Sequence, residues 1–445
     1  ISSIFEHAIK SYPTQEIVSN TVEGGIHKYS FKEWGLRTKK LANALKSTGL
    51  KIGDRVGTLA WNGYRHLELY YATSSSGLIC HTLNPRLHHD QISYIVNHAE
   101  DKILFVDLNI APLVEKASKN FSSVQAVVVM TDKKNMINLN LPKDIKILCY
   151  EEFIEKESDE FHWPELDERT ASSLCYTSGT TGNPKGVLYT HRSTVLHAFG
   201  VNLKDAIPYG SKDCVLPVVP MFHVNAWGTP YAALMCGSKI VFPGPKLDGE
   251  SLTDLMNAEK VTISLGVPTV WLLLLNHLRS SGKKLETVKR LIIGGSACPR
   301  TLFEGFGEEY NVDVIHAWGM TEMSPIGTAN NPLFNMNPVD KKEFYDQKLP
   351  QGRTVFGHEM KLLDDKDNEV EQDGVKQGRL LSRGYWVLKS YYNDETQKDR
   401  FFDGGWFDTG DIATIDKNGF MTITDRNKDI IKSGGEWISS IDLEN

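Results

Sequence analysis

A segment near the middle of the chain combines the residue types that bind phosphate. Residues 176–187 contain three glycines, four hydroxyl side chains of Ser and Thr, and one lysine between apolar residues. Glycine lets the backbone turn sharply and approach a ligand closely, and N–H groups, hydroxyls and an ammonium group together bind phosphate oxygens. Lys185 follows Pro184 and no Gly-Lys-Ser/Thr triplet occurs, so this is not a Walker loop. The segment predicts a phosphate-binding loop made by Thr177, Ser178, Gly179, Thr180, Thr181, Gly182 and Lys185.

Two later segments offer surfaces for a flat ring and groups for metal-bound phosphates. Gly294 and Gly295 follow the expected strand 291–293, and a glycine pair at a strand end lets a flat ring lie against the backbone. Residues 316–322 supply an aromatic ring that can stack on adenine and a hydroxyl, that of Thr321, for a phosphate oxygen. Glu322 offers a carboxylate to Mg²⁺, which takes oxygen ligands and often only one or two from protein.

In their order along the chain these segments resemble the signature motifs of the adenylate-forming enzymes, which are acyl-CoA synthetases, adenylation domains of peptide synthetases, and beetle luciferases. The resemblance covers residues 176–437 and implies ATP, Mg²⁺ and CoA as ligands. It implies that a carboxylate attacks the α-phosphate of ATP, that pyrophosphate leaves, and that the CoA thiol then attacks the acyl-adenylate. The implied nucleotide-binding residues, besides the loop, are Gly295, Ser296, Ala297, His316, Ala317, Trp318, Gly319, Met320, Thr321, Asp411 and Arg426, with Glu322 as the metal ligand.

Residues 220–228 resemble the family segment that lines the carboxylate pocket. Amino-acid-activating members commonly place an Asp after the aromatic residue, whereas this chain has His223, which argues against an amino-acid substrate. Trp227 is interpreted as a gate over an acyl tunnel, with core packing as the alternative, because the same His-Val-Asn-Ala-Trp string occurs in long-chain acyl-CoA synthetases. The implied acyl pocket consists of His223, Val224, Asn225, Trp227 and Gly294.

The end of the chain resembles the start of the family's small C-terminal domain. Lys428 falls at the hinge position, and Lys432, Ser433, Gly434 and Gly435 belong to the segment that faces the site in the thioester-forming pose. The implied catalytic residues are Lys185, Thr321, Glu322 and Lys432. The family's adenylation lysine lies in the part of that domain which this chain lacks, through truncation or because a mobile C-terminal domain is omitted. We therefore expect the chain as given to bind ATP or acyl-AMP but to adenylate poorly.

The resemblance favours a fatty acid–CoA ligase with a preference for medium to long chains. The alternative within the same fold is a CoA ligase for a short, branched, sulfur-containing or aryl acid. His223 and the lack of a carrier domain disfavour a peptide-synthetase domain. A catalytically dead nucleotide-binding protein is a further alternative, against which the presence of Glu322, Asp411 and Arg426 argues.

Composition sets the broader limits. The chain has 445 residues, 40% hydrophobic and 24% charged, with a net charge of −7, which disfavours nucleic-acid partners. Six scattered cysteines without a Cys-x-x-Cys pair argue against a zinc site and for a reducing compartment. His88-His89 is interpreted as a solvated loop.

No apolar run reaches membrane-spanning length, so we expect a cytoplasmic protein, with peripheral membrane contact as in other synthetases without a span. The family includes homodimers, so a homodimer is one expected form.

These segments must be positioned by an α/β fold. Alternating helix and strand patterns predict a large N-terminal region of two helix-covered, mostly parallel sheets, then a small β-barrel, then the start of an α+β domain. The expected boundaries are 1–170, 171–334 with the phosphate loop, 335–425 for the barrel, and 426–445 for the hinge and incomplete C-terminal domain. Helices are expected over residues 31–48, 67–78, 228–237 and 269–279, and strands over 55–60, 103–106, 124–130, 239–242, 261–267, 288–293, 359–363 and 378–382.

Overall fold

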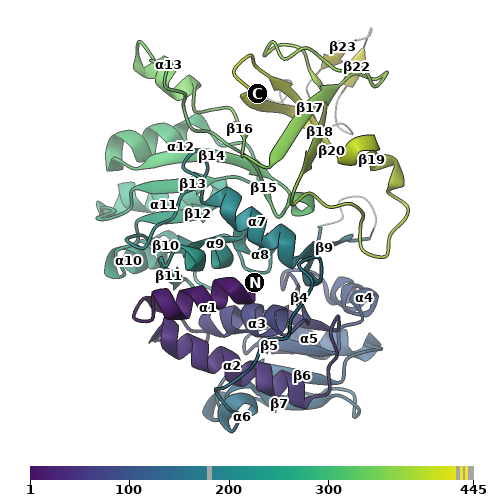
Figure 1. Ribbon diagram of the computed structural model, residues 1–445. Helices are drawn as coiled ribbons and strands as arrows, with labels where there is room; N and C mark the ends of the chain where they lie inside the picture. The colour runs from purple at the N-terminus through teal and green to yellow at the C-terminus, as the bar shows by residue number, and fades with distance from the viewer. Residues whose placement is uncertain (178–182, 427–430, 434–435, 439–445) are drawn as a thin grey trace.

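The computed structural model describes residues 1–177, 183–426, 431–433 and 436–438, with side chains described to residue 425. It contains two large sheets covered by helices and a smaller antiparallel sheet at one end (Figure 1). Among the described residues, no helix combines the length and the apolar character needed to cross a lipid bilayer.

The first sheet has seven strands in the order β7-β6-β5-β3-β4-β8-β9. All neighbours pair in parallel except β8 and β9, which are antiparallel. The inner strand β6, next to the edge strand β7, has the sequence Ala-Val-Val-Val-Met and is wholly buried, as expected where helices cover both faces of a parallel sheet. The strands are β3 (Arg55–Leu59), β4 (Ile79–Thr82), β5 (Ile103–Asp107), β6 (Ala126–Met130), β7 (Lys146–Cys149), β8 (Ala171–Tyr176) and β9 (Gly186–Thr190).

The second sheet has nine strands in the order β16-β15-β14-β13-β12-β10-β11-β1-β2. Its six central strands, from β14 to β1, run parallel, and antiparallel strands close both edges. The strands are β1 (Glu16–Asn20), β2 (Ile26–Ser30), β10 (Cys214–Pro217), β11 (Lys239–Phe242), β12 (Ile263–Gly266), β13 (Arg290–Ile293), β14 (Asp313–Gly319), β15 (Ile326–Ala329) and β16 (Arg353–Thr354).

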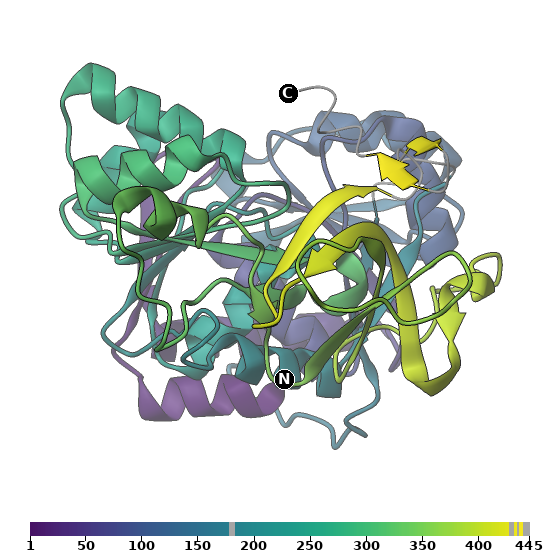
Figure 2. The same ribbon diagram turned by 90° about the horizontal axis from the view of Figure 1, so that it is seen from above.

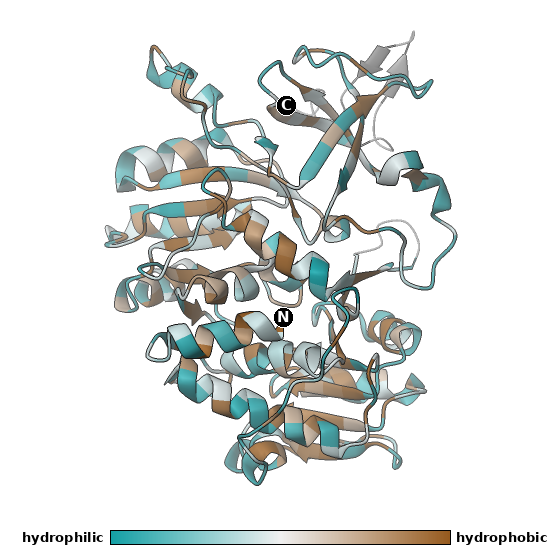
Figure 3. Ribbon diagram, in the orientation of Figure 1, coloured by the Kyte–Doolittle hydropathy of each residue, from teal (hydrophilic) through white to brown (hydrophobic). Residues whose placement is uncertain are grey.

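The helices cover these sheets with their apolar faces. A shared core joins α1, α2, α3, α7 and α9 to strands of both sheets, and a second core packs α10, α11 and α12 on the outer face of the nine-stranded sheet. Figure 3 shows the resulting pattern, with brown strands inside and teal bands on the outer helix surfaces. The helices are α1 (Ser2–Ser11), α2 (Phe31–Ser47), α3 (Tyr64–Ser75), α4 (His89–Ala99), α5 (Ala111–Ala117), α6 (Tyr150–Glu155), α7 (His191–Val201), α9 (Thr229–Met235), α10 (Gly249–Ala258), α11 (Pro268–Ser281), α12 (Arg300–Glu304) and α13 (Lys341–Asp346).

Helix α2 illustrates how the local sequence sets these elements. Ser30 and Glu33 form a reciprocal capping box that satisfies free N–H groups at its start. Its expected apolar face, which includes Trp34 and Leu41, is buried. The helix ends at Ser47, before Gly49, whose φ of 84° lies in the left-handed region.

The third sheet forms the small β unit expected after residue 335. Figure 2 shows it from above, lying across the middle of the molecule. Its path is β17-β18-β20-β19, with β21 paired to β20, and a separate pair, β22-β23, follows. The strands are β17 (His358–Leu363), β18 (Gly378–Gly384), β19 (Phe401–Phe402), β20 (Trp406–Ile415), β21 (Met421–Arg426), β22 (Ile431–Ser433) and β23 (Glu436–Ile438).

The two large sheets do not divide at the expected boundary, residue 170. β8 and β9 follow that residue but belong to the first sheet, whereas β1 and β2 lie near the start of the chain and belong to the second. Strand pairing is not local in sequence, so a change of sequence texture could not reveal this exchange. A smaller difference concerns α3, which spans residues 64–75 in place of the expected 67–78.

Candidate active site

The carboxyl ends of the two large sheets are joined through Asn62, which follows β3. Its Nδ2 donates to the carbonyl oxygens of Pro217 and Val219 at 2.8 and 2.9 Å, and its Oδ1 accepts the Met221 N–H at 2.6 Å. The side chain is only 4% exposed. In open α/β sheets ligands bind outside the carboxyl ends of the strands, so Asn62 holds the segment after β10 at the edge where a ligand site is expected.

Residues 224–227 (α8) form one turn of left-handed helix. Val224, Asn225, Ala226 and Trp227 have φ values of 48°, 52°, 49° and 55°. Left-handed backbone costs an L-residue roughly 1–2 kcal/mol, and a β-branched residue such as Val224 adopts it rarely. Such strain persists only where tertiary contacts impose it, and it is concentrated at functional sites.

Asn225 supplies part of that constraint. Its Nδ2 donates to Ser173 Oγ at 3.0 Å, and its Oδ1 accepts from Tyr70 Oη at 3.3 Å, so its amide connects the turn to the first sheet. Asn225 was expected to line an acyl pocket, but its side chain is buried and engaged in these contacts. We assign it the role of holding the turn.

The turn directs Trp227 against the glycine pair at the end of β13. A Cβ built on Gly294 would lie 3.3 Å from Cη2 of the indole and 2.9 Å from the Ala317 carbonyl oxygen, and one on Gly295 would lie 3.9 Å from Cζ2. The indole therefore packs close to the backbone at Gly294, where an added Cβ would also crowd the Ala317 carbonyl oxygen. Two of the expected acyl-pocket residues, Trp227 and Gly294, are thus in contact, and Gly295, Ser296 and Ala297 continue from them as exposed residues.

His223 and Val224 begin the same segment but face different surroundings. Val224 is buried, whereas His223 has solvent-accessible surface. Desolvation by nearby protein atoms still lowers the pKa of His223 below its ordinary value of 6.5. Its side chain is an imidazole rather than the carboxylate that an amino-acid substrate would require.

The stem of the phosphate loop closes through Thr177 and Lys185. The Thr177 N–H donates to the Lys185 carbonyl at 2.9 Å, and the Lys185 N–H donates to Thr177 Oγ1 at 3.3 Å. The Lys185 ammonium lies 5.5 Å from the ring centroid of Tyr391. Five of the predicted loop residues, Ser178, Gly179, Thr180, Thr181 and Gly182, lie outside the described residues.

Thr321 and Glu322 follow β14 and are held by two tyrosines. Tyr189 Oη donates to the Thr321 carbonyl at 2.6 Å, which links this corner to β9 at the base of the phosphate loop. Glu322 is 6% exposed, and its Oε1 accepts from Tyr391 Oη at 2.7 Å. In the described part of the chain no donor reaches its other carboxylate oxygen, which suits a hard, oxygen-preferring cation such as Mg²⁺.

Trp318 lies deeper than its predicted contact with adenine suggested. It is 8% exposed, and a Cβ added to Gly327 would lie 2.6 Å from its ring. Its Nε1 donates to Asp411 Oδ2 at 3.2 Å. The indole edge therefore orients the carboxylate that was expected to bind ribose, a contact the sequence did not indicate.

The remaining residues of this group have backbone or core positions. His316 is buried, with Nδ1 2.8 Å from the Leu349 carbonyl oxygen, and burial lowers its pKa. Gly319 cannot be replaced without a clash, since a Cβ there would lie 2.1 Å from the Pro325 carbonyl oxygen. Met320 is partly buried and packs in the same apolar cluster as Trp227.

Arg426 pairs with Asp411 in the register of β20 and β21, so the two predicted ribose residues are neighbours across strands. Lys432 and Ser433 belong to β22. Lys428, Gly434 and Gly435 lie outside the described residues.

Sequence reasoning did not select Tyr391, Arg400, Asn62 or His197. Tyr391 is one of 16 tyrosines and carries no distinguishing local pattern. His197 belongs to α7 and its side chain is buried. Its Nε2 accepts the Ile326 N–H at 3.1 Å, and this bond connects α7 to strand β15. Tyr391, Asn62 and His197 act across long sequence separations, whereas the Arg400 side chain donates to residues eight or nine positions away.

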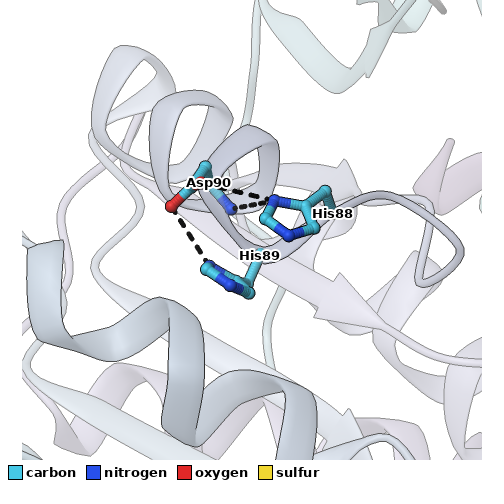
Figure 4. Close-up of side chains that lie close together, drawn as sticks. All are labelled: His88, His89 and Asp90. Atoms are coloured by element: carbon cyan, nitrogen blue, oxygen red, sulfur yellow. Dashed lines mark hydrogen bonds and ion pairs between the residues drawn. The ribbon is translucent and has the colours of Figure 1, made fainter.

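His88 caps helix α4 and His89 is its first residue, so the pair does not lie in a loop as expected, and Asp90 approaches both (Figure 4). Asp90 lies 3.3 Å from His88 and 3.1 Å from His89, measured from its carboxylate oxygens to Nδ1. Candidate ligand atoms of the three residues lie within 4.8 Å of one another. The Asp90 N–H also points to His88 Nδ1 at 3.5 Å, so helix capping accounts for this arrangement.

Comparison with known proteins places this geometry in context. Residues 5–392 match the model of the family described as AMP-binding enzyme. The chain is 49% identical to a 3-methylmercaptopropionyl-CoA ligase of Ruegeria lacuscaerulensis, over 100% of this chain and 82% of that protein. It is 48% identical to a medium-chain-fatty-acid–CoA ligase of Ectopseudomonas oleovorans, over 100% and 80%, and 43% identical to a long-chain-fatty-acid–CoA ligase of Thermus thermophilus, over 99% and 79%.

Solved structures share the fold. A crystal structure of an anthranilate CoA ligase in complex with anthranoyl-AMP matches with a TM-score of 0.85 at 24% identity, over 99% of this chain and 80% of the other. An o-succinylbenzoate CoA synthetase from Bacillus subtilis, in complex with ATP and magnesium, matches with a TM-score of 0.80 at 22% identity, over 99% and 83%.

Proposed function

Because the chain belongs to the AMP-binding enzyme family and is an AMP-forming acid–thiol ligase, we propose that it activates an aliphatic carboxylic acid of short to medium chain length. The observation that carries this proposal is the position of Trp227, whose indole closes on Gly294 and Gly295 at the carboxyl end of β13. In this proposal a large ring at this place would limit the depth available to an acyl chain.

The surroundings of Trp227 favour an uncharged tail. Trp227 and Met320 share an apolar cluster, and desolvation lowers the pKa of the nearby His223, which favours its neutral form. An ammonium group on the substrate would find no carboxylate partner in this segment, and burying an unpaired charge is costly. These properties support an aliphatic acid over an amino acid.

The nucleotide end of the site is proposed from the residues around Glu322 and Asp411. The loop based on Thr177 and Lys185 would bind the β- and γ-phosphates, and Thr321 would contact a phosphate oxygen. Asp411 would accept hydrogen bonds from the ribose hydroxyls, with Arg426 beside it in register. These groups orient ATP and stabilise charge, which is most of what phosphoryl and adenylyl transfer require of a protein.

Glu322 is the residue that would hold Mg²⁺. Its buried carboxylate has the ligand type, and magnesium sites commonly combine one or two protein carboxylates with substrate phosphates. When bound, the ion would neutralise phosphate charge. Lys432, Ser433, Gly434 and Gly435 are proposed to face the site during thioester formation with CoA, with Lys428 as the hinge.

A thioether acid is the second candidate substrate. Sulfur makes favourable contacts with aromatic rings, worth about 0.3–1.5 kcal/mol, and Trp227 supplies such a ring at the pocket. A relative of this chain is named a 3-methylmercaptopropionyl-CoA ligase. That acid has the same length as pentanoic acid, so the two substrates differ mainly by a sulfur atom in place of a methylene.

Calorimetric binding of non-hydrolysable acyl-AMP analogues tests both proposals. The series would contain acetyl, pentanoyl, octanoyl, palmitoyl, benzoyl and 3-(methylthio)propanoyl groups. We expect affinity to rise by up to about fourfold per methylene, which corresponds to about 0.8 kcal/mol, until the pocket closed by Trp227 is filled. Trp227→Ala should move this limit to longer chains, whereas Trp406→Ala, on β20 in the small β unit, should leave it unchanged.

The outcomes are distinct. Tight binding of the palmitoyl analogue by both the wild type and Trp227→Ala would contradict the short-to-medium limit. Strongest binding of the benzoyl analogue would favour an aryl acid instead. Tighter binding of the 3-(methylthio)propanoyl analogue than of the pentanoyl analogue, lost in Trp227→Leu, would identify the thioether acid as the substrate class.

A further inference from the structure

Tyr391 lies between an arginine and the carboxylate of Glu322. Its Oη donates to Glu322 Oε1 at 2.7 Å and accepts from Arg400 Nη1 at 2.8 Å. Both the phenol and the carboxylate are buried. Charge-assisted hydrogen bonds of this length in a buried setting are strong and directional.

The direction of this chain of hydrogen bonds is fixed. A guanidinium has donors only, so the phenol oxygen must accept from Arg400 and its hydrogen must point to Glu322. The geometry alone therefore makes the phenol the donor to Glu322 Oε1.

Arg400 is itself immobilised by contacts other than Tyr391. Its Nε and Nη2 both donate to the Asp408 carbonyl, at 3.0 and 2.7 Å, and its guanidinium lies 4.6 Å from the Phe407 ring centroid. Since Asp408 and Phe407 belong to β20, the rigidity of the third sheet is transmitted to Tyr391. Groups whose own partners are fixed hold a neighbouring ligand most accurately.

We propose that Tyr391 is a positioning residue for Glu322, occupying one carboxylate oxygen so that the other is presented in a single orientation to a divalent cation. This inference rests on the proposed role of Glu322 as the metal ligand. Arg400 acts one step further out, by fixing the direction in which Tyr391 donates.

The same segment also holds the base of the phosphate loop. The Tyr392 N–H donates to the Gly186 carbonyl at 2.8 Å, and the Tyr391 ring lies under the Lys185 ammonium. Tyr391 therefore contacts both Glu322, through its hydroxyl, and Lys185, through its ring, while Tyr392 holds the backbone next to Lys185. The hydroxyl and the ring of Tyr391 can be separated by substitution.

The test measures ATP affinity by calorimetry, with Mg²⁺ titrated in and with EDTA present. We expect Tyr391→Phe to weaken the apparent Mg²⁺ affinity of the ATP complex about tenfold, as is typical when a partner of a metal ligand is lost. Its ATP affinity in EDTA should stay at the wild-type value, because the ring remains beside Lys185. Tyr391→Leu removes the ring as well and should weaken ATP binding in EDTA too.

Two controls make the result interpretable. Tyr392→Phe makes the same chemical change one residue away while keeping the backbone bond to Gly186, and it should behave as wild type. Glu322→Gln should abolish most of the Mg²⁺ dependence; if it does not, the proposed metal role of Glu322 fails. If Glu322→Gln does so but Tyr391→Phe titrates with Mg²⁺ like the wild type, or loses affinity equally with and without Mg²⁺, the positioning role of Tyr391 is overturned alone.

Discussion

Trp318 at the end of β14 donates its indole N–H to Oδ2 of Asp411 on β20, at 3.2 Å. Asp411 is only 2% exposed, so its orientation depends on protein partners rather than on water. This hydrogen bond joins the nine-stranded sheet to the third sheet at the nucleotide end of the site. Trp318 therefore helps to orient the carboxylate of Asp411, which is proposed to bind ribose.

Replacing Trp318 with Phe tests this support. The ring volume is largely kept, but the donor to a buried carboxylate is lost, and hydrogen bonds to charged groups contribute about 1.5–3 kcal/mol. We expect ATP to bind about tenfold more weakly, measured by calorimetry. The loss should be much smaller for 2′,3′-dideoxy-ATP, which has no ribose hydroxyls. Equal losses for both nucleotides would show that Trp318 does not act through Asp411.

Asn62→Ala should strongly destabilise the protein, because it leaves three buried backbone groups near residue 219 without their partners. Each unsatisfied buried group costs about 1–3 kcal/mol, so the free energy of unfolding should fall by about 3 kcal/mol or more in urea titrations. Asn43 also donates to two carbonyl oxygens, but at the surface. Asn43→Ala is therefore the matched control, with a change of about 0.5 kcal/mol or less expected.

The buried His197 makes stability depend on pH. Desolvation lowers its pKa to about 3 in the folded protein, against an ordinary value of 6.5. Between these values the unfolded chain binds the extra proton, so stability falls as pH decreases from 6.5 toward 3, by up to about 1.4 kcal/mol per pH unit. His197→Gln should remove this part of the slope in urea unfolding measured from pH 7 to pH 4.

The contribution of His197 is the difference between the pH dependence of stability in the wild type and that in His197→Gln. Burial raises the pKa of Asp107 to about 7, which acts in the opposite sense, since stability then decreases as pH rises from about 4 to 7. His197→Gln leaves Asp107 unchanged. An identical pH slope in wild type and variant would exclude His197 as the source.

The left-handed turn predicts an unusual response to glycine. At Ala226, glycine removes roughly 1–2 kcal/mol of backbone strain, which offsets its greater entropy in the unfolded chain and the loss of a buried methyl group. We expect Ala226→Gly to change the free energy of unfolding by less than about 0.5 kcal/mol. Ala72 is equally buried but lies inside the right-handed helix α3, so Ala72→Gly should cost about 1–2 kcal/mol. Equal losses at the two positions would contradict a strained turn.

Elements set by local patterns could be predicted from the sequence. Helix α2, with its capping box and terminal glycine, and the fully apolar strand β6 lie where the periodicity placed them. Helix α3 was displaced because its start at Gly63 has no side-chain cap to mark it. The phosphate loop was indicated for the same local reason, because its glycines, hydroxyls and lysine lie within one short segment.

The remaining features depend on pairs that are far apart in the sequence. Trp318 and Asp411 are separated by 93 positions and Tyr391 and Glu322 by 69, so no window of sequence contains both members. The left-handed turn contains no glycine within residues 224–227, and only the contacts of Asn225 with the first sheet reveal why the backbone is held there. The exchange of strands between the two large sheets is hidden in the same way.

That exchange constrains how the protein can be made. Strand β1 leaves the ribosome early, yet its parallel partner β11 is synthesised only after the whole first sheet has emerged. In the first sheet, β4 has no partner on one side until β8 has been synthesised. The second sheet therefore cannot be completed until the first has been synthesised, and β1, although paired with β2, leaves its other edge without a partner for much of the synthesis. The N-terminal hairpin must await strands made much later, which a linear succession of independent domains would not require.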